Sequence, residues 1–162
     1  MKRFFDTDES LATLFQRVLL ATVVAGHGAQ KLFGWFGGYG FDGTVQYFTG
    51  SIGIPTAMAV LIIVMETAGM FALAAGFLTR LLAAGTSLVM LGAIAFEHGK
   101  VGFFLNWGGV AGRGEGYEFH LLALALSIPL VATGAGAWSL DRLIVRRLSS
   151  SASPALAAAR AA

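Results

Sequence analysis

The sequence predicts an all-α integral membrane protein, a four-helix bundle with its N- and C-termini in the cytoplasm. Of the 162 residues, 56% are hydrophobic and only 12% are charged, whereas soluble domains carry about 25% charged residues. The mean hydropathy is +0.73. Four separate apolar segments also approach the roughly 20 residues that cross a bilayer as a helix.

Each apolar segment is expected to be one membrane span. The four spans are predicted at residues 11–36, 54–77, 81–98 and 119–138. Pro55 suits a helix start, where its missing N–H has no partner anyway, and Pro129 is expected to kink the fourth span. Residues 1–148 are predicted to form one transmembrane domain, followed by a disordered Ser/Ala-rich tail over 149–162.

Lysine and arginine residues predict the orientation, because cytoplasmic flanks of spans are enriched in them. The side with both termini would carry eight: Lys2, Arg3, Arg17, Arg80, Arg142, Arg146, Arg147 and Arg160. The other side would carry three: Lys31, Lys100 and Arg113. The segments 37–53 and 99–117 would then face outward.

Composition excludes several classes of function. The chain has no cysteine, which rules out disulfides, dithiol relays and any Cys-ligated cofactor. A net charge of +2 without a basic stripe does not indicate a nucleic-acid partner. The expected surroundings are the lipid bilayer and either a protein partner or further copies of the chain.

Glu66 is the most anomalous residue of the second span, since its neighbours are apolar for more than a turn on either side. A bare carboxylate in hydrocarbon is very unfavourable, so Glu66 is expected to be protonated or paired. The nearest expected partners are His27 and Lys31, one turn apart on the first span. Arg17 shares their face, and both snorkelling to lipid headgroups and a functional role stay open for it.

A second polar group gathers at the expected outer ends of the third and fourth spans. It comprises Glu97, His98, Glu115, Glu118 and His120. One interpretation is a metal site, because His and carboxylate side chains are suitable N and O ligands. The candidate ligands are His27, Glu66, His98, Glu118 and His120. No HxxxH or ExxH spacing supports this interpretation.

The other interpretation is a site for a lipid-soluble redox molecule such as a quinone. Quinone carbonyls need hydrogen-bond donors, and quinone reduction needs protons, which His and Glu side chains can relay. The candidate catalytic residues are Glu66, His27 and Lys31. The candidate cofactor-binding residues are His27, Glu66, Trp107, Glu118 and His120.

Five motifs in this order resemble the DoxX family over roughly residues 14–143. They are the stretch from Arg17 to Phe33 with Gly26-His27-Gly28, then Glu66-Thr-Ala-Gly69 with Gly76-Phe-Leu-Thr-Arg80, Glu97-His98-Gly99 running to Asn106-Trp107, Gly114 to His120, and Gly134 to Asp141. The resemblance implies a four-helix protein of the bacterial inner membrane. It also implies an association with quinone-linked oxidoreductases or oxidative stress, but it supplies no established catalytic residue.

The leading hypothesis is therefore a membrane subunit of a quinone-linked oxidoreductase or oxidative-stress system, which binds a quinone-like molecule near the outer leaflet. One alternative is a structural or assembly subunit with no chemistry of its own. Two further alternatives are a metal-binding protein and a small-solute transporter. The chain lacks the inverted repeats typical of many secondary transporters.

Overall fold

The computed structural model describes residues 5–147 and 149, and every regular element in that part of the chain is helical. In chain order these elements are α2 (Leu11–Phe33), a 3₁₀ turn (Trp35–Gly37), α3 (Gly40–Tyr47), a π turn (Phe48–Ile52), α4 (Thr56–Glu66), α5 (Ala68–Ala74), α6 (Thr79–Phe96), a 3₁₀ turn (His98–Lys100) and α7 (Glu118–Thr133). A further helical segment covers residues 140–147. The tail predicted to be disordered lies outside the described residues, except for Ser149.

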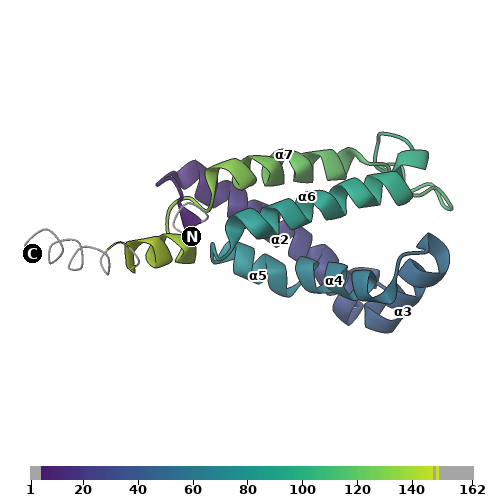
Figure 1. Cartoon of the computed structure of the whole chain (residues 1–162). Helices are drawn as coiled ribbons and strands as arrows, with labels where there is room; N and C mark the ends of the chain where they lie inside the picture. The colour runs from purple at the N-terminus through teal and green to yellow at the C-terminus, as the bar shows by residue number, and fades with distance from the viewer. Residues whose placement is uncertain (1–4, 148, 150–162) are drawn as a thin grey trace, which may run out of the picture.

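The long helices pack around a common apolar core (Figure 1). α6 and α7 lie side by side, while α2 contacts α4, α5 and α7, and α4 and α5 also contact α6. Residues 5–10 and the segment 140–147 lie together at one end of the molecule, here called the terminal end. α3 and residues 97–117 lie at the opposite end, here called the loop end.

Within the described part of the chain, three helical stretches are long and apolar enough to cross a membrane: Leu11–Phe33, Thr56–Ala74 and Thr79–Phe96. α7 is apolar but has only 16 residues. Large side chains on the outside of these helices, such as Leu61, Phe71 and Leu88, are more than half exposed. Such an apolar exterior suits contact with lipid, because lipid chains are as apolar as these side chains.

Local chemistry sets the helix boundaries. The Ser10 side chain accepts a hydrogen bond from the Thr13 backbone N–H and caps the start of α2. Gly34 follows the last residue of α2 in the left-handed conformation at φ 72°, so the helix ends at Phe33, three residues before the expected end at 36. Pro55 directly precedes α4, as expected of a helix start. The third helix begins at Thr79 and ends at Phe96, slightly ahead of the predicted 81–98.

Two helices differ from the prediction in a way that matters for the site. The expected second span is divided at Thr67, whose backbone (φ −107°, ψ −90°) is not helical and lies directly after Glu66. The fourth helix ends at Thr133 instead of 138, because Gly134 and Gly136 adopt φ values of 84° and 73°. Positive φ values interrupt an α-helix, and glycine adopts them without steric cost.

Candidate functional site

The candidate site begins where α2 and α4 cross. Gly28 of α2 lies directly against the backbone of Glu66, and a Cβ built at Gly28 would lie 2.5 Å from the Glu66 carbonyl carbon. Only a residue without a side chain permits so close an approach of two helices. This contact brings the last turn of α2, with His27 and Lys31, beside the end of α4.

Lys31 and Glu66 form an ion pair at this crossing. The Lys31 Nζ donates to Oε2 of Glu66. The Glu66 side chain is 6% exposed and that of Lys31 is 24% exposed. The pairing expected for Glu66 is therefore present, and Lys31 is the partner. A buried carboxylate needs such a partner, because an isolated charge is strongly disfavoured in an apolar environment.

His27 lies beside this pair and contacts the start of α7. Its ring centroid is 4.8 Å from that of Phe119, with the rings tilted by 46°. His27 is also within electrostatic reach of both Lys31 and Glu66. We call Lys31, Glu66 and His27 together the ion-pair site.

His98 and His120 pack against each other nearer the loop end. Their ring centroids are 4.1 Å apart, with the rings tilted by 38°. His120 is 7% exposed, and its Nδ1 atom is buried without a hydrogen-bond partner in the described part of the chain. His98 is half-buried, and its Nδ1 lies 2.8 Å from the backbone oxygen of Glu115.

Glu118 and Trp107 contact each other, and the Glu118 carboxylate is engaged by the loop that precedes α7. Its Oε2 accepts hydrogen bonds from the Leu105 backbone and from Nε1 of Trp107, each at 3.2 Å. The backbone N–H of Glu118 also donates to the Phe103 oxygen at 2.9 Å. Trp107 is 77% exposed. These contacts hold the loop against α7. Glu118 and Trp107 therefore stabilise the loop end, and neither takes part in the ion pair.

The described residues contain no group of three or more His, Cys, Asp or Glu side chains arranged to hold a metal ion. His98 and His120 stack on each other, and Glu118 is bonded to the loop, so the candidate ligands do not converge on one point. The geometry gives the metal interpretation no support.

A second buried polar cluster at the terminal end had not been expected from the sequence. Arg17 is 1% exposed and donates to the carbonyl oxygens of Ala135 (2.6 Å) and Trp138 (3.3 Å), so it does not snorkel to headgroups. The Asp141 carboxylate accepts from the backbone N–H groups of Leu78 and Thr79 at 2.8 and 2.9 Å, and thus caps α6. In the sequence, the only indication of this cap was the pair of polar residues Ser139 and Asp141 directly after the fourth apolar segment.

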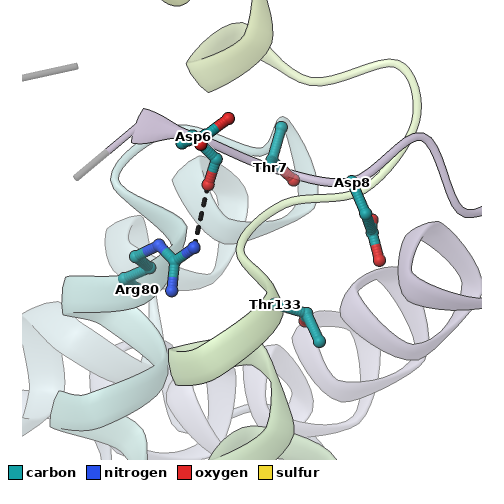
Figure 2. A pocket seen from close by; sticks show the side chains of 5 residues that line it. All are labelled: Asp6, Thr7, Asp8, Arg80 and Thr133. Carbon is teal, nitrogen blue, oxygen red and sulfur yellow. Dashed lines mark hydrogen bonds between the residues drawn. The ribbon is translucent and has the colours of Figure 1, made fainter. Parts of the chain in front are cut away.

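A surface hollow also lies at the terminal end (Figure 2), and none of the residues of the ion-pair site lines it. It has a volume of about 240 Å³ and is lined by Asp6, Thr7, Asp8, Arg80 and Thr133. Arg80 donates to the backbone oxygen of Asp6 at 2.9 Å, the contact drawn in Figure 2. Arg80 also donates to the Val131 and Ala132 carbonyl oxygens, so main-chain groups already bind both terminal nitrogens of its guanidinium.

Comparisons with known proteins agree with the motif pattern. The DoxX family model matches residues 12–99. The chain is 32% identical to a Bacillus subtilis (strain 168) protein named "Putative oxidoreductase CatD", over 84% of this chain and 89% of that protein. It is 29% identical to the "Inner membrane protein YqjF" of Escherichia coli (strain K12), over 91% and 99% of the two chains. No solved structure matches.

The family match covers more than half of the chain, and the similarity to the Bacillus protein extends over most of both sequences. The apolar helices and the similarity to the Escherichia coli protein are consistent with each other, and the chain is a multi-pass protein of the bacterial inner membrane. The chain belongs to the DoxX family.

Proposed function

We propose that this protein is a membrane subunit of a quinone-linked oxidoreductase system and binds a quinone-like molecule at the ion-pair site. The observation that carries the proposal is the buried Lys31–Glu66 pair beside His27, among helices that expose many large apolar side chains. Charged groups inside a membrane domain are costly and are typically retained for function. The similarity to a relative named as an oxidoreductase supports the redox class.

The proposal includes a topology of four spans, with α7 as the fourth and both ends of the chain in the cytoplasm. The terminal end carries Arg80, Arg142 and Arg146, and an excess of basic residues is typical of cytoplasmic flanks. The residues that begin α2 and those that follow α7 lie at this same end (Figure 1), as an even number of spans requires. In this topology the loop end faces the outer side of the membrane.

The donor set at the site fits the carbonyl oxygens of a quinone. An ammonium group has three N–H donors, so Lys31 keeps two after it has bonded to Glu66. Its side chain is 24% exposed, which gives a molecule dissolved in the lipid access to it. The ring of His27 offers a second donor, and Phe119 presents an aromatic surface beside it.

When bound, a quinone supplies two-electron chemistry that also takes up two protons. Lys31 would orient a carbonyl oxygen through its free N–H groups, and His27 or Glu66 would hold the one proton that this oxygen takes up. The other proton goes to the second carbonyl oxygen. Electrons would come from an oxidoreductase partner, since the chain has no cysteine to serve as a dithiol donor.

Equilibrium binding of decylubiquinone to the purified protein in lipid nanodiscs tests the proposal. We expect saturable binding that weakens about tenfold in Glu66→Gln, the effect of losing one hydrogen bond that involves a charged group. Asp42→Asn is the matched control, because Asp42 is an exposed carboxylate on α3. Absence of saturable binding, or equal binding by wild type and Glu66→Gln, would contradict the proposal.

A structural subunit is the second candidate, favoured by the fact that Lys31 and Glu66 already satisfy each other. Removing one partner of a buried pair costs about 3 kcal/mol or more, whereas removing both is often close to neutral. This function predicts that Glu66→Gln is unstable and that adding Lys31→Met restores stability. It further predicts that the stable double variant still co-purifies with its protein partner and that no variant binds decylubiquinone.

A further inference from the structure

His120 has an unusual environment for a polar residue. It lies in the first turn of α7 and is 7% exposed, yet its Nδ1 has no hydrogen-bond partner among the described residues. Leaving a buried polar atom unpaired costs about 1–3 kcal/mol. Such an atom calls for an explanation, and one explanation is that it exchanges a proton or binds a water.

His98 stacks on His120 and reaches the surface of the loop end. Its Nδ1 lies 2.8 Å from the Glu115 carbonyl oxygen, and a carbonyl can only accept a hydrogen bond. The proton of a neutral His98 is therefore on Nδ1, which leaves the lone pair on Nε2. The half-buried ring of His98 thus carries a basic nitrogen. Its ring centroid lies 4.1 Å from that of the buried His120 ring.

His120 also lies close to the ion-pair site. The Phe119 ring lies 5.5 Å from His120 and 4.8 Å from His27, between centroids. His120 is within electrostatic reach of His27 and Lys31, and His27 is within reach of Glu66. His120 thus adjoins the ion-pair site through Phe119 and contacts His98, which belongs to the loop end.

The carboxylates around His98 have other partners. Glu115 accepts from the Asn106 backbone N–H at 2.6 Å, and Glu118 accepts from the Trp107 indole N–H at 3.2 Å. Glu97 is hydrogen-bonded to the Tyr47 side chain of α3. Nε2 of His98 and Nδ1 of His120 are thus not engaged by these carboxylates, and no described contact assigns either nitrogen a partner.

We infer that His98 and His120 form the path by which protons pass between the ion-pair site and the aqueous phase at the loop end. This inference rests on the proposed function. In the inward direction, Nε2 of His98 takes a proton from water and passes it to Nδ1 of His120 through one bridging water. His120 then releases the proton on its own Nε2 towards His27. Each histidine gains one proton and loses one, so no charge accumulates.

The test is the rate at which the ring N–H of His120 exchanges with deuterium, followed by ¹⁵N NMR on the protein in lipid nanodiscs. We expect His98→Ala to slow this exchange about a hundredfold, the lower end of what a positioned proton-transfer group contributes. Imidazole added to the buffer should restore the rate, which it would not do if His98 only supported the fold. Lys100→Gln is the matched control, because Lys100 is an exposed neighbour in the same turn.

An unchanged exchange rate in His98→Ala, or a slowed rate that imidazole does not restore, would overturn the inference. His98→Gln replaces His98→Ala if the alanine variant does not fold, and the same slowing is then expected. The readout needs no quinone, so its outcome is separate from the binding test. Failure of decylubiquinone to bind the wild type would contradict the proposed function, whereas rapid exchange without His98 would contradict the proton path alone.

Discussion

Replacing Gly28 with alanine should separate α2 from α4 and disable the ion-pair site. An alanine Cβ would lie 2.5 Å from the Glu66 carbonyl carbon and would overlap the carbonyl oxygen. Non-bonded carbons rest about 3.5 Å apart, so the helices must move apart by about 1 Å. Both contacting atoms belong to the backbone, so no side chain can rotate away.

We expect Gly28→Ala to lower the free energy of unfolding by about 1–3 kcal/mol, the usual cost of forcing extra volume into a packed interior. Decylubiquinone binding should weaken as well, because the displacement moves Lys31 relative to Glu66. Unfolding is followed by circular dichroism as sodium dodecyl sulfate is titrated into mixed micelles, and binding is measured in nanodiscs.

Gly26→Ala is the matched control, since a Cβ at Gly26 would meet nothing within 4 Å. It makes the same chemical change on the same helix, two residues away. We expect this variant to be at least as stable as the wild type, because alanine favours the helix over glycine by about 0.5–1 kcal/mol. Equal stability and equal binding for the two variants would refute the argument that Gly28 sets the helix crossing.

Two further predictions concern the ends of the molecule. Asp141→Ala removes the cap of α6 and should lower the free energy of unfolding by about 1–2 kcal/mol in the same titration, whereas an unchanged midpoint would show that the cap does not contribute. At the loop end, burial raises the pKa of Tyr47 above its ordinary value of 10.0, and its hydrogen bond to Glu97 raises this pKa further. Because the folded state holds this proton more tightly than the unfolded state, the contribution of Tyr47 to stability is full below pH 10.0 and is lost as the pH rises through the folded pKa. Tyr47→Phe should remove this part of the pH dependence of the free energy of unfolding. Identical pH dependence in the wild type and in Tyr47→Phe would contradict the assignment.

The sequence predicts much of the fold and the central pair, for physical reasons. Apolar runs of sufficient length identify the membrane helices, because hydrocarbon tolerates few alternatives. Glu66 needs a partner for the same reason, and Lys31 on the first span was one of only two expected candidates. That argument uses charge and helix periodicity alone, and both are visible in the sequence.

Other features depend on packing that hydropathy does not represent. The break at Thr67 lies where Gly28 of α2 approaches Glu66 and Thr67, a contact between distant segments that hydropathy does not record. α7 ends early because Gly134 and Gly136 adopt positive φ values, which average hydropathy does not register. Arg17 bonds to main-chain carbonyls about 120 residues away, and a carbonyl has no signature in the sequence.

Photolabelling with an azido-quinone analogue tests the central claim most directly, because it locates the bound molecule. The labelled protein is digested and the modified peptides are identified by mass spectrometry, with decylubiquinone as competitor. We predict competed labelling of the last turn of α2, around His27 and Lys31, and of the first turn of α7. We also predict that Glu66→Gln needs about ten times more of the analogue for the same labelling, in line with its weaker binding. Labelling confined to the hollow lined by Asp6 and Arg80, or labelling that decylubiquinone does not displace, would contradict the account.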